Sequence, residues 1–104
     1  MSETSASGPA AEAAVGAVKR TLAVANKRGL HARAAAKFVR TAALFDATIK
    51  VSFKGQEVSG FSIMGLMMLA AGIGSSIEVS CSGRQASEAL AAISALVEGK
   101  FGED

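Results

Sequence analysis

The sequence has few of the residue types that most often carry chemistry in proteins. Its 104 residues include one histidine, one cysteine and one proline, and neither tryptophan nor tyrosine. One histidine and one cysteine do not make a zinc site, and no His/Cys/Asp spacing fits a hydrolytic triad. We therefore expect neither a metal nor a cofactor. Cys81 lies in an alternating run and has no partner for an internal disulfide, which predicts a buried apolar role in a reducing compartment, with a redox role as the alternative.

Charge of one sign is also lacking. Eleven lysine and arginine residues face nine aspartate and glutamate residues, for a formal net charge of +2. This balance is far from that of a protein that neutralises many nucleic-acid phosphates, so we expect no nucleic-acid partner. The alternative, a small α+β nucleic-acid binder, would use a basic patch of Lys19, Arg20, Lys27, Arg28 and Arg33. Such a binder would want aromatic platforms, which the lack of tryptophan and tyrosine disfavours.

Long apolar runs are missing as well. The longest one, residues 63–73, is interrupted by Gly65 and Gly72 and is shorter than the roughly 20 residues that a membrane helix needs. Residues 1–18 are rich in alanine and serine and lack both a basic leader and an uninterrupted apolar core. We predict a flexible N-terminal extension over residues 1–18 and one domain over residues 19–104, in a soluble, cytoplasmic and monomeric protein without membrane insertion.

Hydrophobic periodicity predicts the elements of this domain. Strands with period two are expected at residues 19–26, 48–54, 57–59 and 76–82, and a tight turn at residues 54–56 joins the second strand to the third. Helices are expected from residue 32 to about 42, at residues 63–70 and at residues 86–97. The order is βαββαβα. Because most of the strands have one apolar face, we predict an α+β fold, an open-faced β-sandwich in which a four-stranded antiparallel sheet carries three helices on one face.

His31 directly precedes the first predicted helix. The first turn of a helix offers unpaired backbone N–H groups and the positive end of the helix dipole. A phosphoryl group on the His31 ring would therefore meet the backbone amides of Ala32 and Arg33, and the Arg33 guanidinium suits phosphate oxygens. The alternative is a surface histidine that happens to precede an amphipathic helix.

Three motifs together indicate a family. They are NKRGLHAR at residues 26–33, Phe38-Val39, and SIMGL at residues 62–66. In these motifs and in element order, residues from about 20 to 97 resemble the HPr phosphocarriers of the phosphoenolpyruvate-dependent phosphotransferase system. The resemblance implies a phosphoryl carrier rather than a conventional enzyme. It would serve sugar uptake or a nitrogen-type branch of carbon and nitrogen regulation.

The resemblance also implies roles for individual residues. His31 would accept a phosphoryl group from enzyme I, forming phosphohistidine, and pass it to a histidine of an enzyme IIA protein or domain, with Arg33 as the active-site arginine. The partner-binding residues would be Ile63, Met64 and Met67, an adaptable apolar patch, with Lys37 and Arg40 among the basic residues around it.

Ser62 matches the position that a serine kinase/phosphorylase modifies in many members of the family, and that enzyme is a further partner. A regulatory binding module controlled at Ser62 is the alternative function, while a plain helix N-cap explains this serine equally well. The chain departs from the family at two positions: Ala34 replaces a common proline, and Phe61 replaces a basic residue before the serine. The second departure puts recognition by the kinase in doubt.

Overall fold

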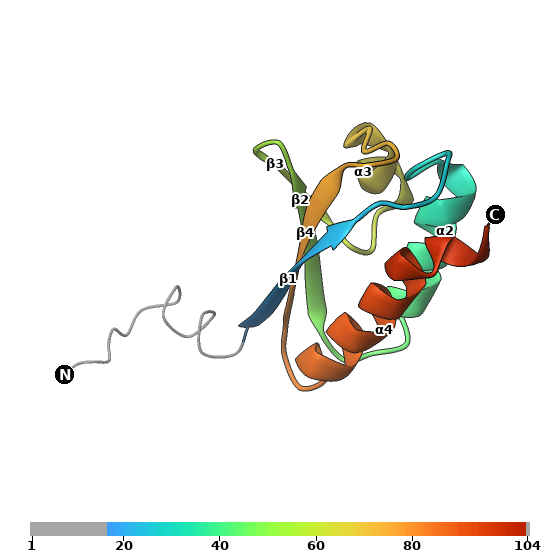
Figure 1. Cartoon of the computed structure of the whole chain (residues 1–104). Coiled ribbons are helices and arrows are strands. Elements are labelled where there is room, and N and C mark those ends of the chain that lie inside the picture. The colour runs from blue at the N-terminus through green and yellow to red at the C-terminus, as the bar shows by residue number, and fades with distance from the viewer. Residues whose placement is uncertain (1–16, 104) are drawn as a thin grey trace.

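The predicted alternation of apolar and polar residues produces four strands in the computed structural model, which describes residues 17–103 (Figure 1). The strands are β1 (Ala17–Ala23), β2 (Thr48–Phe53), β3 (Gln56–Ser59) and β4 (Ser76–Ser82). The helices are α2 (Ala32–Ala42), α3 (Ile63–Met68) and α4 (Ala86–Glu98), and a short 3-10 turn, η1 (Lys100–Gly102), follows them. The predicted order βαββαβα is confirmed over the described residues.

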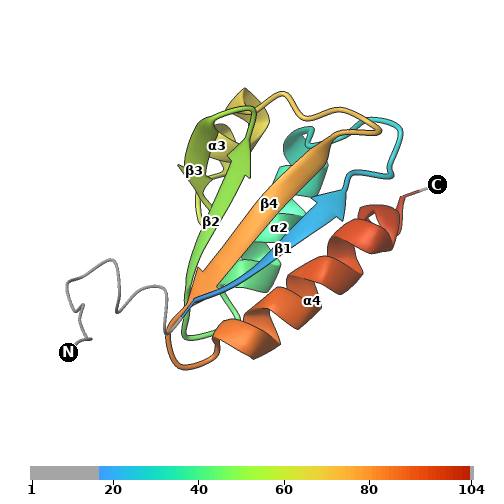
Figure 2. The same cartoon turned by 60° about the vertical axis from the view of Figure 1, so that its left-hand side comes forward.

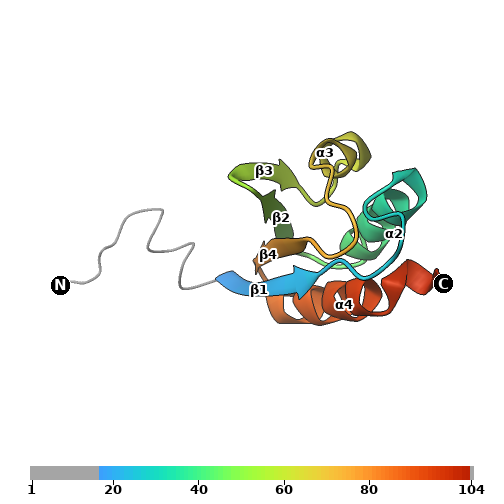
Figure 3. The same ribbon diagram turned by 45° about the horizontal axis from the view of Figure 1, so that its top comes forward.

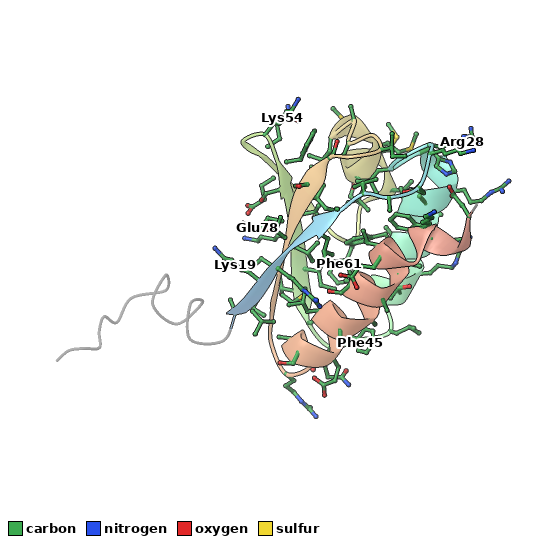
Figure 4. All side chains as sticks on the ribbon, viewed as in Figure 1. Lys19, Arg28, Phe45, Lys54, Phe61 and Glu78 are labelled. Atoms are coloured by element: carbon green, nitrogen blue, oxygen red, sulfur yellow. The ribbon has the colours of Figure 1, made fainter. Side chains whose placement is uncertain are left out.

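The four strands form one antiparallel sheet in the order β1-β4-β2-β3. Val79 of β4 lies opposite Arg20 on one side and Val51 on the other, so β4 is a central strand. The predicted fold class is confirmed, because the helices lie on one side of the sheet (Figure 3) and none covers its other face (Figure 2). On that open face, Lys19 and Glu78 point away from the helices (Figure 4).

The core lies between the sheet and the helices. Helix α2 buries the stripe Ala34, Ala35, Phe38 and Ala42, whose spacing is that of an amphipathic helix. The inward residues of β4 are buried too, Cys81 among them. Burial raises the pKa of the Cys81 thiol, which keeps it neutral and unreactive and agrees with the apolar role predicted for it.

The predicted bounds of β1 and α3 differ from the structure by two or more residues, and the ends of β2 and α4 and the start of β3 differ by one. Strand β1 spans Ala17–Ala23 rather than residues 19–26, because Ala17 and Val18 pair with Ser82 and Cys81. These two residues therefore belong to the sheet and not to the predicted extension, of which residues 1–16 lie outside the described part. Helix α3 ends at Met68 instead of residue 70, since Ala70 takes a left-handed conformation with φ of 55° that a helix cannot continue.

The hairpin between β2 and β3 forms at the predicted place. Lys54 and Gly55 have φ angles of 50° and 81°, and Phe53 pairs with Gln56. Two left-handed residues match the twist of the flanking strands, which is why this turn type suits a two-residue hairpin. Gln56 therefore starts β3, whereas the sequence had placed it in the turn.

Candidate functional site at the N-terminus of helix α2

An open cleft of about 380 Å³ lies where α2 begins. Its lining brings together side chains from the loop before the helix, from the helix itself and from the C-terminal segment, namely Lys27, Arg28, His31, Arg33, Lys37, Gly102 and Glu103. Arg28 lies at this end of the molecule in Figure 4. Four cationic side chains face one carboxylate here, so the cleft favours anionic ligands.

His31 is the N-cap residue of α2. Its backbone is extended, with φ of −74° and ψ of 178°, and its carbonyl oxygen accepts the first helical hydrogen bond, from the Ala35 N–H at 2.8 Å. The ring makes no capping hydrogen bond, so the helix start does not depend on the imidazole. Ala32 and Arg33 occupy the first two helical positions, whose N–H groups have no acceptor within a helix. The structure thus brings together the predicted ring and the predicted backbone donors.

The C-terminal segment lies beside α2 (Figure 1), and the ring of His31 contacts it. Nε2 lies 2.6 Å from Oε2 of Glu103, and each of these side chains is 16% exposed. The amide nitrogen of Asn26 donates to Oε1 of Glu103 at 3.1 Å and to the carbonyl oxygen of Gly29 at 2.8 Å. Asn26, which the sequence had placed at the end of the first predicted strand, is fully buried. The imidazole is therefore held from one side and is not a free surface group.

This network shifts the titration of the carboxylate. The hydrogen bond from His31 holds the pKa of Glu103 below its ordinary value of 4.5. Desolvation opposes this shift, while the hydrogen bond from Asn26 and the charges of His31 and Lys37 add to it. Because the pKa is lowered, the stabilisation is present above the ordinary value and is lost as the pH falls through the folded-state value. Glu103 is therefore an anion at neutral pH.

Lys37 and Arg33 differ in how firmly they are held. Lys37 was predicted among the basic residues around the docking patch, but its Nζ donates to the carbonyl oxygen of Phe101 at 2.6 Å, so it anchors the C-terminal segment. Arg33 is exposed, and within residues 17–103 no salt bridge involves it. Arg40, on the same helix, is also exposed and does not line the cleft.

The apolar patch predicted on α3 is exposed. Exposure is 40% for Ile63, 68% for Met64 and 39% for Met67, and Met68, which was not among the predicted docking residues, is 73% exposed. The Leu30 N–H donates to the carbonyl oxygen of Ala71 at 3.0 Å, which ties the loop before His31 to the segment after α3. The patch and the cleft therefore lie at the same end of the molecule.

Ser62 caps α3, as its position predicted. Its Oγ accepts a hydrogen bond from the Gly65 N–H at 2.9 Å, and its backbone is extended. The side chain thus satisfies one of the helix N–H groups that would otherwise have no acceptor.

Asn26 and Glu103 are the residues that sequence reasoning missed. Asn26 belongs to the motif at residues 26–33, yet an asparagine between a strand and a helix usually indicates a turn. Glu103 is separated from His31 by 72 positions, and nothing in its local sequence points to the histidine. A distant pairing of this kind has no periodic signal.

Comparison with known proteins agrees with this geometry. The family model "PTS HPr component phosphorylation site" matches residues 18–99 of the chain. The chain belongs to the HPr family. Phosphocarrier protein HPr of Cupriavidus necator is 45% identical over 86 residues, which cover 83% of this chain and 97% of the relative. Phosphocarrier protein NPr of Shewanella violacea is 43% identical over 86 residues, covering 83% of this chain and 94% of the relative.

Solved structures of the family have the same fold. HPr of Thermoanaerobacter tengcongensis superposes with a TM-score of 0.80 at 41% identity and covers 84% of this chain and 98% of its own. The general role of this HPr-family chain is therefore that of a phosphocarrier of the phosphotransferase system. Among the described residues, no helix is both long and apolar enough to cross a membrane, and no cluster of three or more acidic, histidine or cysteine side chains is placed to hold a metal ion.

Proposed function

We propose that His31 accepts a phosphoryl group from phospho-enzyme I and passes it to enzyme IIA proteins or domains. The main support is the position of the imidazole at the first turn of α2, beside the Ala32 and Arg33 amides and in a cleft lined by cationic side chains. The carrier would work in the cytoplasm, in sugar uptake or in a nitrogen-type regulatory branch, since both use the same residues.

The chemistry follows from the imidazole and its place on the helix. Neutral imidazole has a nucleophilic lone pair near neutral pH, and its phosphoramidate gives up the phosphoryl group readily once the ring is protonated. The positive end of the helix dipole favours the anion that is bound after transfer. His31 thus stores a phosphoryl group until a partner protein takes it up, and the chain is a carrier with a phosphohistidine intermediate.

Docking would use the exposed face of α3 beside the cleft. Ile63, Met64 and Met67 offer flexible apolar side chains that fit partners of different shape. Lys37 and Arg40, together with the cationic residues of the cleft, would steer acidic partner surfaces and raise association rates.

The test is direct phosphorylation. The protein is incubated with enzyme I, phosphoenolpyruvate and magnesium, and its mass is measured at neutral and at acid pH. We expect one added phosphate at neutral pH that disappears in acid, as a phosphoramidate does. A phosphate that survives acid, or none at all, would contradict the proposal.

Replacing Arg33 should slow transfer without unfolding the protein. The guanidinium is exposed and unpaired within residues 17–103, so Arg33→Ala should change stability by less than about 0.5 kcal/mol. Loss of its hydrogen bonds to the phosphoryl oxygens should lower the rate in both directions by about tenfold to a hundredfold. Rapid-quench transfer assays measure this, with Arg84→Ala, an exposed cation paired only weakly with Asp46 at 3.9 Å, as the control. Unchanged rates would remove Arg33 from the mechanism.

A negative charge at Ser62 should inhibit the carrier. Asp and Asn are both good N-cap residues, so Ser62→Asp and Ser62→Asn should each keep the helix start and differ in charge alone. We expect Ser62→Asp to accept phosphate from enzyme I about tenfold more slowly, because it places an anion beside the docking patch. Ser62→Asn should match the wild type. Equal rates for the two variants would contradict a regulatory role for Ser62, the alternative function.

A further inference from the structure

The orientation of the His31 ring depends on a residue from the other end of the chain. We propose that Glu103 is a positioning residue for His31: its carboxylate holds the proton on Nε2 and leaves the Nδ1 lone pair free to attack phosphorus, while Asn26 anchors the carboxylate. This inference rests on the proposed function of His31 and adds two residues to its machinery.

The contact with Glu103 determines which nitrogen of the His31 ring holds the proton. A carboxylate only accepts hydrogen bonds, so the 2.6 Å contact between Oε2 of Glu103 and Nε2 of His31 places the ring hydrogen on Nε2. In neutral imidazole the other nitrogen then has the lone pair. Within residues 17–103 no hydrogen bond reaches Nδ1. Glu103 therefore selects the nitrogen that can act as the nucleophile.

Asn26 holds Glu103 in place. The amide of Asn26 reaches two acceptors, Oε1 of Glu103 and the Gly29 carbonyl oxygen, so its nitrogen must face them. Its own Oδ1 is buried and has no partner among the described residues. A buried acceptor without a partner is unfavourable and uncommon in folded proteins. The Asn26 amide nitrogen thus links the loop before His31 to Glu103.

A left-handed turn after α4 places Glu103 beside the His31 ring. Lys100, Phe101 and Gly102 have φ angles of 59°, 55° and 73°, so two non-glycine residues in succession are left-handed. Such strain persists only where the surrounding structure holds it. Here the Phe101 side chain is fully buried, and Lys37 donates to its carbonyl oxygen. The chain therefore turns back after α4 at a conformational cost and places Glu103 against the ring.

Phosphoryl transfer to His31 proceeds with Glu103 and Asn26 in these roles. The Nδ1 lone pair forms the new N–P bond, and the bond from phosphorus to the donor atom of enzyme I breaks with its electron pair leaving on the donor. The proton stays on Nε2, so positive charge develops on the His31 ring. The adjacent carboxylate stabilises this charge, as a buried aspartate does for a catalytic histidine. The cations Lys27, Arg28, Arg33 and Lys37 line the cleft that the phosphoryl oxygens would enter.

The test is the tautomer of the ring, read by long-range ¹H–¹⁵N correlation spectra of the full chain at about pH 8, well above the ordinary histidine pKa of about 6.5. The chain has one histidine, so the spectrum contains a single imidazole. In the wild type we expect a protonated Nε2 and an unprotonated Nδ1. In Glu103→Ala the two nitrogen shifts should move toward each other, and transfer from phospho-enzyme I should slow about threefold to tenfold.

Three further variants separate positioning from a structural effect. Glu103→Gln keeps one acceptor oxygen, which can accept from Nε2 or from the Asn26 amide but not from both, so the nitrogen shifts should move part of the way toward each other and the rate should fall as well. Asn26→Ala, first checked for folding by its amide spectrum, should move the shifts in the same direction as Glu103→Ala and less far. Glu98→Ala removes an acidic side chain that lies 3.8 Å from Arg20 and should change nothing at the ring.

The spectra and the transfer rates test the roles of Glu103, Asn26 and His31 separately. Glu103→Ala spectra identical to those of the wild type would overturn the proposal even if the rate fell, because Glu103 would then act on the partner and not on the ring. A moved tautomer with an unchanged rate would overturn its role in transfer. Wild-type spectra unchanged by Asn26→Ala would remove Asn26 as the anchor. Failure of the wild type to take up phosphate would instead refute the function proposed for His31, and the spectra would still decide whether Glu103 sets the tautomer.

Discussion

His31→Ala should abolish acid-labile phosphorylation completely while leaving the fold intact. The chain has no second histidine, so no other imidazole can take up the phosphoryl group. The ring makes no capping hydrogen bond to α2, and the backbone of residue 31 continues to accept from Ala35 in the variant. Mass spectrometry after incubation with enzyme I and phosphoenolpyruvate measures the loss, and circular dichroism measures the fold.

The acid treatment distinguishes phosphate on a histidine from phosphate on a hydroxyl group. A phosphoramidate on His31 is lost in acid, whereas a phosphate ester on a hydroxyl such as that of Ser62 survives it. The His31→Ala protein should therefore show no acid-labile phosphate, and any residual acid-stable signal would identify a serine or threonine. Persistent acid-labile phosphate in a folded His31→Ala protein would show that the imidazole is not the acceptor.

Gly29→Ala should destabilise the protein and disturb the site together. Gly29 has φ of 65°, and a Cβ there would lie 2.4 Å from the Ala71 carbonyl oxygen and 2.8 Å from the Gly72 Cα. A left-handed alanine costs about 1–2 kcal/mol, and the clash with backbone adds about 1–3 kcal/mol. We expect a loss of about 2–5 kcal/mol in the free energy of unfolding, measured by urea denaturation. The same clash would break the hydrogen bond from Leu30 to Ala71 and displace His31, so phosphate uptake should fall as well.

Two other glycines separate the strain from the clash. Gly55 has φ of 81°, but a Cβ at this position would have no neighbouring atom within 4 Å, so Gly55→Ala should cost only the left-handed strain, about 1–2 kcal/mol. Gly72 has neither a positive φ nor a close neighbour, so Gly72→Ala should be neutral or slightly stabilising. If Gly29→Ala lost no more stability than Gly55→Ala, the close approach to Ala71 would not matter.

The regular part of the fold follows from local patterns. The i, i+3, i+4 spacing of Ala35, Phe38 and Val39 predicted α2, and the alternation around Val79 predicted β4 with the bounds that the structure has. Both signals are strong because one side of each element is buried against a common core. Boundaries were less predictable where pairing or a left-handed residue decided them, as at Ala17 and Ala70.

The residues of the site also fall into two groups, those that local sequence predicts and those that distant contacts place. His31, Arg33 and Ser62 could be named from the sequence because each lies in a local motif at a helix start. Glu103 could not, since its contact with His31 depends on the turn that follows α4 and on the burial of Phe101. The anchoring role of Lys37 was missed for the same reason: its acceptor, the Phe101 carbonyl, comes from a distant part of the chain.

The left-handed turn after α4 also affects how the protein should be handled. Glu103 lies in the cleft, so an affinity tag fused downstream of it would start within reach of the reactive ring and could obstruct an incoming enzyme. Strand β1 begins at Ala17, at the end of the sheet remote from the loop that leads into His31 (Figure 1). A purification handle or a fluorescent label is therefore better attached upstream of that strand.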